Sequence, residues 1–489
     1  MSLRRKTFSA VRWTTVSSAS KALLSVASIT VLARLLVPDD YGLIAMVSAV
    51  MGFAGLFADL GANSAFVQRQ DITQEQRSSL FWLNVSMSAG MAILVIVLSP
   101  LFAQLFGDPR LAPLMMLSST TFVLVALGQQ VKMSAEKELD FKIIVIIEIS
   151  AVFIGFVTAV LAALSGWGVY SLVASGIVGS AAATVFYWII VARGWRPMWR
   201  LRLNDIRSFL GFGSAIVADN IVNYINRTVD IFIGGRLLGV TELGLYSVPR
   251  TLVLQLSGMV NSIVTRVGFP LIAKVQSDTT LVRSIYLKTL NMTAAFNAPL
   301  YVGIAFFAPD IVAIVLGPGW DRSGTLLRIL ALWGGLRATG NPVGSLLYGM
   351  GRAGLSLKWN LSLLLIVPPV VWIGSEKGPE GMAWALLFLQ IGLFIPAWYF
   401  LVRPLCHARL LEYSIAALRP FFLAGLAIAI AYGVAGQSES AYFRVIIGVS
   451  IAAPLYFSLS YVGNREWVAA MMELAGHPLV NAKGRSGNS

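Results

Sequence analysis

The chain has 489 residues, of which 57% are hydrophobic and only 12% are charged. Soluble domains carry roughly 25% charged residues, so this composition excludes a water-soluble globular enzyme. The single cysteine, Cys406, excludes an internal disulfide, and with only two histidines the chain offers no metal-binding cluster. We therefore expect an all-α, polytopic membrane protein that holds no cofactor and no metal.

Hydropathy divides the sequence into fourteen segments, each long enough for a transmembrane helix of about 20 residues. In chain order they cover residues 10–37, 41–66, 79–106, 111–133, 141–165, 167–192, 207–238, 242–270, 284–316, 324–350, 354–374, 380–402, 417–436 and 442–462. The basic start resembles that of a signal peptide. The segment that follows is too long and too rich in Ser and Thr for one, so we predict a retained first helix.

Lysine and arginine are distributed unevenly between the two sets of predicted loops. One side of the membrane holds 24 of them, and the other side holds 4, namely Arg110, Arg322, Lys377 and Arg444. Because cytoplasmic loops carry the excess of positive charge, both termini are predicted to lie in the cytoplasm. These cations are spread over short loops, which disfavours a nucleic-acid-binding patch.

The predicted loops also divide the chain into lobes. The outer loops are only a few residues long, so none can fold into a catalytic domain. The longest cytoplasmic connection, RGWRPMWRLRLND, lies near the middle of the sequence. We therefore predict an N-terminal lobe (1–192), a cytoplasmic linker (193–206), a C-terminal lobe (207–402), two additional helices (403–465) and a cytoplasmic tail (466–489).

An internal repeat relates the two halves. The pattern Arg34-Leu35-Leu36-x5-Gly42-Leu43 recurs as Arg236-Leu237-Leu238-x5-Gly244-Leu245, always 202 residues later. Six predicted helices separate the two copies, so the halves share one orientation. Parallel repeats of this kind in transporters hold a binding site at their interface. A generic helix-turn-helix solution in lipid is the simpler alternative.

The segments LARLLVPDDYGL and FADLGANSAFVQRQ resemble the polysaccharide-transport family of the multidrug/oligosaccharidyl-lipid/polysaccharide (MOP) exporter superfamily. The chain is most similar to Wzx-type flippases, including those for colanic acid and xanthan. The resemblance implies two six-helix lobes with two added helices, and a cavity lined by spans one, two, seven and eight. It also implies an undecaprenyl-pyrophosphate-linked oligosaccharide as cargo in the bacterial inner membrane. Membrane lipids, a polysaccharide polymerase and export machinery are the implied partners.

Nine of the 37 Lys and Arg residues lie inside predicted spans. A cation near the bilayer centre costs at least about 2.5–3.5 kcal/mol, so such residues call for a functional explanation. Spans one and seven, which are repeat partners, also carry polar residues at intervals of three and four. This spacing puts the polar residues on one helix face, toward a wet cavity. The candidate substrate-binding residues are Lys21, Asn223, Arg227, Asp230, Arg250 and Arg337.

Cations in such a cavity suit an anionic cargo, because arginine donates paired hydrogen bonds to phosphate. The alternative is a neutralised latch in which Arg227 pairs with Asp230 and Lys21 pairs with Asp219. Two acids, Asp59 and Glu148, are open to other interpretations. Asp59 fits a structural role at a helix end, whereas Glu148 is a lone acid in an apolar run and a candidate for ion coupling.

Three competing functions make different demands on the chain. A cation or drug antiporter of the same superfamily needs an acidic or aromatic cavity, which the basic excess disfavours. A membrane-integral polysaccharide polymerase or ligase needs a long outer loop with catalytic residues. A scaffold that does not transport needs no buried cations on a polar stripe. The sequence therefore favours a transporter over an enzyme.

Overall fold

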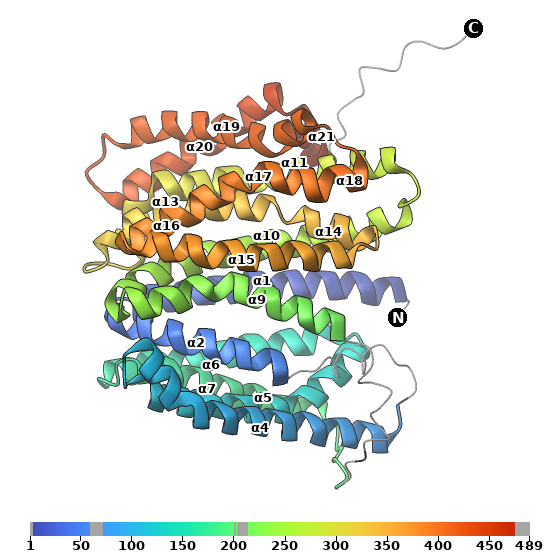
Figure 1. The fold of residues 1–489 in the computed structure, drawn as a ribbon, viewed down its shortest axis with the longest axis vertical. Helices are drawn as coiled ribbons and strands as arrows, with labels where there is room; N and C mark the ends of the chain where they lie inside the picture. Colours follow the sequence, from blue (N-terminus) through green and yellow to red (C-terminus); the bar gives the residue numbers. More distant parts are fainter. Residues whose placement is uncertain (1–2, 59–71, 200–201, 203–213, 475–489) are drawn as a thin grey trace. The chain divides into compact units, whose positions relative to one another are not determined.

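The computed structural model describes residues 3–58, 72–199, 202 and 214–474 of the chain. Every regular element in these ranges is a helix (Figure 1). The predicted all-α class is therefore confirmed. The elements are α1 (Leu3–Leu32), α2 (Pro38–Ala58), α4 (Gln74–Phe106), α5 (Leu111–Lys137), α6 (Phe141–Leu164), α7 (Tyr170–Phe186), the π-helix η1 (Tyr187–Val191), α9 (Ser214–Leu237), α10 (Val240–Lys274), α11 (Thr279–Phe306), α12 (Ala308–Val315), α13 (Asp321–Thr339), α14 (Pro342–Gly349), α15 (Ala353–Ser375), α16 (Gly378–Gly392), α17 (Phe394–Ala397), the π-helix η2 (Trp398–Val402), α18 (Arg403–Cys406), α19 (Leu410–Ala435), α20 (Ala441–Gly463) and α21 (Arg465–Leu474).

The described helices are those of a multi-pass membrane protein. Nine spans in the described ranges are long and apolar enough to cross a bilayer, and α11 with α12 forms a tenth that is bent by 78°. Helices α1, α9 and α10 are not among these nine, although they are 30, 24 and 35 residues long. They carry several of the charges found inside predicted spans. The count of fourteen spans therefore stays a prediction.

Local sequence signals determine where several helices begin and end. Helix α4 begins with a capping box in which the Thr73 hydroxyl accepts a hydrogen bond from the Gln76 backbone at 3.2 Å. Its C-cap is Gly107, whose left-handed φ of 78° suits glycine. Asp278 is the N-cap of helix α11, and its carboxylate accepts backbone hydrogen bonds from Thr280 and Leu281 at 3.0 and 3.1 Å.

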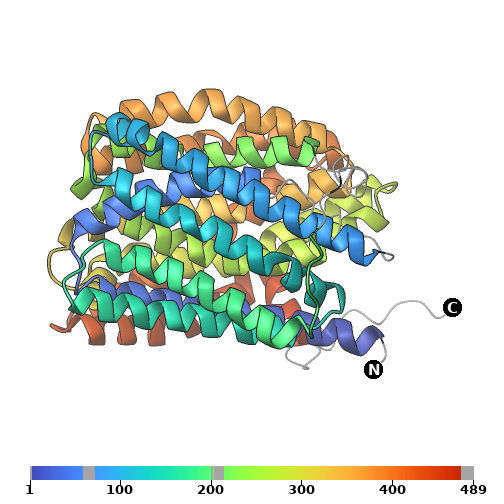
Figure 2. The ribbon, with the colours of Figure 1, turned by 90° about the horizontal axis from the view of Figure 1, so that it is seen from below.

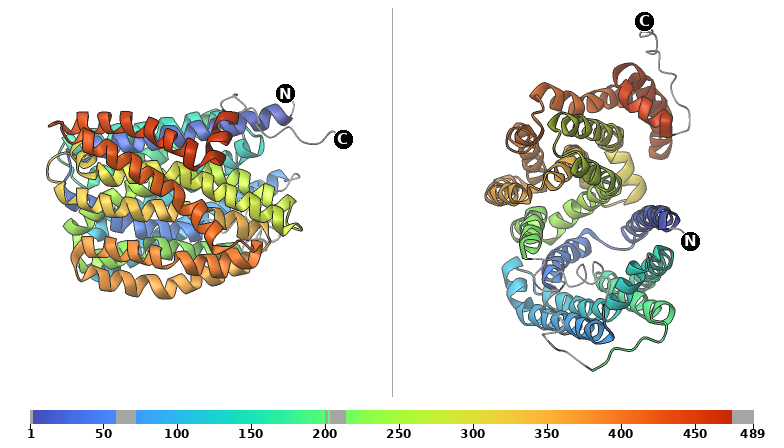
Figure 3. Two further views of the ribbon diagram at one scale, coloured as in Figure 1. Left: turned by 90° about the horizontal axis from the view of Figure 1, so that it is seen from above. Right: turned by 90° about the vertical axis from the view of Figure 1, so that its right-hand side faces the viewer.

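Contacts divide the chain into two compact units, which are described separately below. Unit 1 contains residues 1–252, 315–326 and 357–386, and unit 2 contains 253–314, 327–356 and 387–489. Unit 1 thus includes the opening helices of both predicted halves. Within each unit the long helices run side by side, as the end-on view on the right of Figure 3 shows.

In unit 1, helix α5 packs against both α4 and α7, and α6 packs against both α7 and α1 (Figure 2). An aromatic cluster joins the ends of these helices, with Phe81 edge-on to Trp195 at a centroid distance of 5.9 Å. The Thr184 hydroxyl donates a hydrogen bond across to the Leu124 carbonyl at 2.6 Å. A hydrogen bond of this kind compensates a polar group that lipid cannot solvate.

The two copies of the repeat motif meet within unit 1. A Cβ atom added to Gly42 would lie 1.9 Å from the carbonyl oxygen of Val240, and one added to Gly244 would lie 1.9 Å from that of Pro38. Residues 38 and 240 are themselves related by the repeat offset. So are Asp39 and Thr241, which share a hydrogen bond of 2.5 Å over a separation of 202 residues. Both copies of the motif therefore have glycine where the two backbone segments approach each other, and the two close contacts are reciprocal.

Polar contacts join α11, α19 and α20 in unit 2. Arg283 donates to Glu412 at 2.9 Å, and Arg444 donates to Asp310 at 2.8 Å. Deeper in the unit, the Tyr456 hydroxyl donates to the Ala295 carbonyl at 2.9 Å. These contacts tie the C-terminal helices to α11 and α12.

Candidate functional site

Helix α9 presents the polar face that the sequence predicts for span seven. Asn223 and Arg227 are four residues apart, about one helical turn, and both are exposed. The neighbouring Tyr224 instead faces α2, where its hydroxyl donates to the Ala49 carbonyl at 2.8 Å. Packing through Tyr224 thus leaves the adjacent face, with Asn223 and Arg227, uncovered.

Further along α9, Asp230 is the centre of a buried cluster. The Arg250 guanidinium, on α10, holds both Asp230 oxygens, with its Nη2 atom 2.9 Å from Oδ1. The Tyr246 hydroxyl donates to Oδ2 at 2.7 Å. The Asp230 and Arg250 side chains are only 5% and 10% exposed, so each needs the other's charge.

This cluster changes the expected pairing. The predicted latch joined Asp230 to Arg227, whereas the structure joins Asp230 to Arg250, and Arg250 also donates to the backbone carbonyl of Arg227. The physical reason is burial. Asp230 and Arg250 both face the α9–α10 contact, and Arg227 lies a turn away on the exposed face.

Arg227 therefore differs from Arg250 in what it can offer a ligand. Among the residues that the structure describes, no ion pair includes the Arg227 side chain. Its backbone is braced by Arg250, which fixes the position of α9 at that turn. Arg227 thus presents an exposed guanidinium on a rigid support, a suitable arrangement for binding an anion.

Lys21 lies in a second cluster, beside a cavity of about 480 Å³ between α1, α5, α6 and α7. Its Nζ atom is 2.5 Å from Oε2 of Glu148, and Lys132 approaches the other oxygen, Oε1, at 2.8 Å. Glu148 thus bridges two lysines from different helices. The expected partner of Lys21, Asp219, instead accepts a hydrogen bond from Asn360 at 3.0 Å.

Lys132 is not among the candidate residues predicted from the sequence, although it takes part in this cluster. A signal for it exists in the sequence. A lone acid such as Glu148 within IIVIIEISAVF requires a counter-charge. Lys132 and Glu148 are on opposite arms of the short α5–α6 turn, 16 residues apart.

The remaining predicted residues lie elsewhere. Arg337 belongs to α13 in unit 2, where its guanidinium is 5.2 Å from the centroid of the Trp333 ring. Asp59 lies outside what the structure describes. The substrate-binding roles of Lys21, Asn223, Arg227, Asp230, Arg250 and Arg337 all stay predictions.

Comparison with known proteins adds a family to this geometry. A family model described as "Polysaccharide biosynthesis protein" matches residues 31–324. The chain is 30% identical to the lipopolysaccharide biosynthesis protein WzxC of Escherichia coli K12, over 98% of this chain and 96% of that one. It is 24% identical to the succinoglycan biosynthesis transport protein ExoT of Rhizobium meliloti, over 95% and 94% of the two chains.

Solved structures agree on the fold. The lipid II flippase MurJ, in an inward closed conformation, superposes with a TM-score of 0.71 at 13% identity, covering 94% of this chain and all of that one. A multidrug resistance MATE transporter of the MOP superfamily superposes with a TM-score of 0.53 at 15% identity, covering 85% and 98%. The resemblance inferred from the sequence is thereby confirmed. The chain belongs to the polysaccharide biosynthesis protein family, among the Wzx-type flippases, and has the fold of the MOP exporter superfamily.

Proposed function

We propose that this protein flips an undecaprenyl-pyrophosphate-linked oligosaccharide repeat unit across the cytoplasmic membrane for exopolysaccharide biosynthesis. The cargo moves by alternating access between the N-terminal lobe (1–192) and the C-terminal lobe (207–402), with both termini in the cytoplasm. The names of the relatives support a transporter of polysaccharide precursors rather than an enzyme.

The observation that carries this proposal is the exposed Arg227 on the polar face of α9. The cargo crosses the membrane with at least two phosphate charges, which need compensation away from water. Arg227 supplies a guanidinium that is not occupied by a carboxylate of the described residues, and Asn223 adds an amide on the same face. A drug antiporter for cations is disfavoured, because its cargo would meet this positive charge.

The other predicted residues take supporting roles in the proposal. Arg250 and Asp230 hold the α9–α10 contact that positions Arg227. Lys21 lines the cavity between α1, α5, α6 and α7, and it can bind the cargo once its ion pair with Glu148 breaks. Arg337 contributes positive charge from the C-terminal lobe.

The test replaces Arg227 by Ala in the producing strain. A charge-assisted contact of this kind contributes about 1.5–3 kcal/mol, so the variant is expected to lose about 10–100-fold in cargo affinity. Surface polysaccharide should fall, and the lipid-linked repeat unit should accumulate on the inner leaflet. Arg196→Ala, which removes an exposed cation outside the cluster, is the matched control and should export normally. Normal export by a folded Arg227→Ala variant would refute the assignment.

A further inference from the structure

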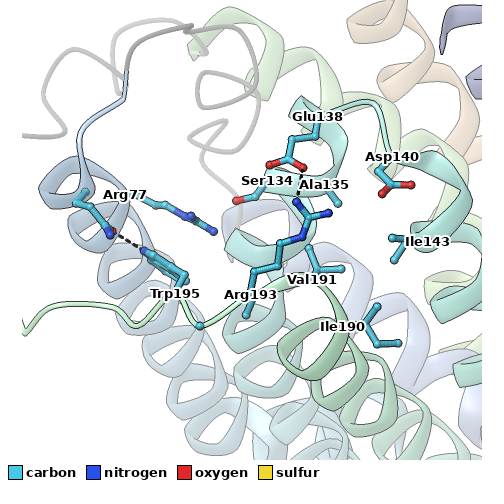
Figure 4. Close-up of a pocket in the computed structure, with 13 residues that line it drawn as sticks. Arg77, Ser134, Ala135, Glu138, Asp140, Ile143, Ile190, Val191, Arg193 and Trp195 are labelled. Carbon is cyan, nitrogen blue, oxygen red and sulfur yellow. Dashed lines mark hydrogen bonds and ion pairs between the residues drawn. The ribbon is translucent and has the colours of Figure 1, made fainter. Parts of the chain in front are cut away.

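A second pocket, separate from the clusters above, lies at one end of unit 1. It has a volume of about 400 Å³ and lies where α4 and α6 begin and where α5 and η1 end (Figure 4). This volume is within the range of roughly 300–1,000 Å³ that small-ligand sites occupy. The walls include charged side chains of both signs together with the apolar Ile143, Ile190 and Val191.

Arg77 provides an immobilised cation on one side of this pocket. Its guanidinium carbon lies 3.9 Å from the centroid of the Trp195 ring. That ring is held in turn by a hydrogen bond of 2.7 Å from its indole nitrogen to Gln74. The Nε atom of Arg77 is buried without a hydrogen-bond partner, and no ion pair among the described residues includes Arg77. A buried donor of this kind calls for an acceptor that a ligand can supply.

Asp140 provides an anion on the opposite side, as Figure 4 shows. It is the residue before α6, yet its carboxylate makes no capping hydrogen bond with that helix. Within the described ranges it also takes part in no ion pair. Between Asp140 and Arg77 lies the pair of Arg193 and Glu138, whose charged atoms are 3.6 Å apart and satisfy each other.

The charged side chains that line the pocket therefore add up to no net charge, but one cation and one acid are left unpaired on opposite sides. Two cations and two acids line it, and one of each sign is paired. A purely anionic ligand would meet Asp140, and a purely cationic ligand would meet Arg77. A ligand that carries charges of both signs can interact favourably with both residues.

Neighbouring aromatic residues indicate that this end of the unit lies at headgroup depth. The ring of Trp199, which is 90% exposed, stacks on Trp82 at a centroid distance of 4.4 Å. Tryptophan is enriched at the interface between membrane and water. The abundant molecules there that combine a phosphate with an ammonium group are phospholipids.

We propose that this pocket binds the headgroup of a zwitterionic phospholipid with a primary ammonium group, such as phosphatidylethanolamine. Its phosphate accepts hydrogen bonds from Arg77, its ammonium group donates to Asp140, and its glycerol backbone lies along Ile190 and Val191. The bound lipid ties residues 193–195, which begin the predicted linker, to α4 and α6. This role is independent of the cargo that the protein carries.

Native mass spectrometry of the purified full-length protein tests the proposal, with phosphatidylethanolamine, phosphatidylcholine and phosphatidylglycerol titrated separately. We expect phosphatidylethanolamine to bind at least fivefold more tightly than the other two. Arg77→Met and Asp140→Asn should each abolish that preference, and Arg77→Lys should retain part of it. Lys142→Met, which removes an exposed cation close to Asp140, is the control and should leave the preference intact.

Three results would overturn the proposal. Equal binding of phosphatidylglycerol would mean a simple anion site, and equal binding of phosphatidylcholine would mean that the ammonium group forms no hydrogen bond with Asp140. Displacement by free phosphoethanolamine at the concentration at which the lipid binds would identify a soluble ligand instead. Should Arg77→Met fail to fold, Asp140→Asn and Arg77→Lys carry the same comparison.

Discussion

At the scale of single residues, the buried Asp230 has the largest predicted effect on stability. Its carboxylate accepts hydrogen bonds from Arg250 and from Tyr246 in a site that is almost closed to solvent. Asp230→Asn leaves a buried guanidinium without its counter-charge, which typically costs about 3–5 kcal/mol. Tyr246→Phe removes one hydrogen bond and should cost about 1 kcal/mol. The melting temperature in detergent should therefore be highest for the wild type, slightly lower for Tyr246→Phe and much lower for Asp230→Asn. Equal melting temperatures would contradict the buried cluster.

Glu148 is expected to be coupled energetically to its two lysines. Replacing Glu148 by Gln leaves Lys21 and Lys132 facing each other without an anion between them. Removing one of these cations as well should relieve the repulsion. The free energy of unfolding of the double variant Glu148→Gln with Lys21→Met should therefore exceed the value expected from adding the two single effects by about 0.5–3 kcal/mol. Strictly additive melting shifts would show that the bridge contributes nothing.

At the scale of helices, the repeat motif has a structural meaning that can be tested directly. Gly42 and Gly244 each lie against a carbonyl of the other repeat, at a distance that no side chain fits. Gly42→Ala and Gly244→Ala must push the turns apart and should each cost about 1–3 kcal/mol. Gly90→Ala in α4, where a methyl group meets open space, is the matched control and should be neutral or stabilising by up to about 1 kcal/mol. Similar melting temperatures for all three variants would contradict the close contact.

Several features of the structure could be predicted from the sequence. Composition predicts the helical class, periodicity predicts the polar face of α9, and the internal repeat predicts that the segments after α1 and α9 are related. Lys21 and Asn223 are also 202 residues apart, so two of the candidate residues occupy equivalent positions in the two halves.

The pairing of charges is what the sequence leaves open. Lys21 and Glu148 are 127 residues apart, and their contact depends on how α1 and α6 are rotated against each other. Periodicity defines a face of one helix but not the partner that this face meets. For the same reason Arg227 and Arg250 look alike in the sequence, although one is exposed and the other is buried against Asp230.

At the scale of the whole molecule, family and fold agree with the charge pattern. A chain whose relatives serve polysaccharide biosynthesis also has the fold of MurJ and of MATE transporters. The fold alone does not choose between lipid-linked and drug cargo, because flippases and antiporters share it. The exposed arginine on α9 favours the anionic cargo.

The most direct test of this account is to measure cargo movement in liposomes that contain only the purified protein and a fluorescent polyprenyl-pyrophosphate-linked oligosaccharide. A membrane-impermeant enzyme or quencher outside the vesicles reports how much cargo reaches the outer leaflet. The account predicts protein-dependent movement of the labelled lipid that Arg227→Ala reduces at least tenfold and Arg196→Ala leaves unchanged. Movement no faster than in protein-free liposomes, under every ion gradient applied, would contradict it.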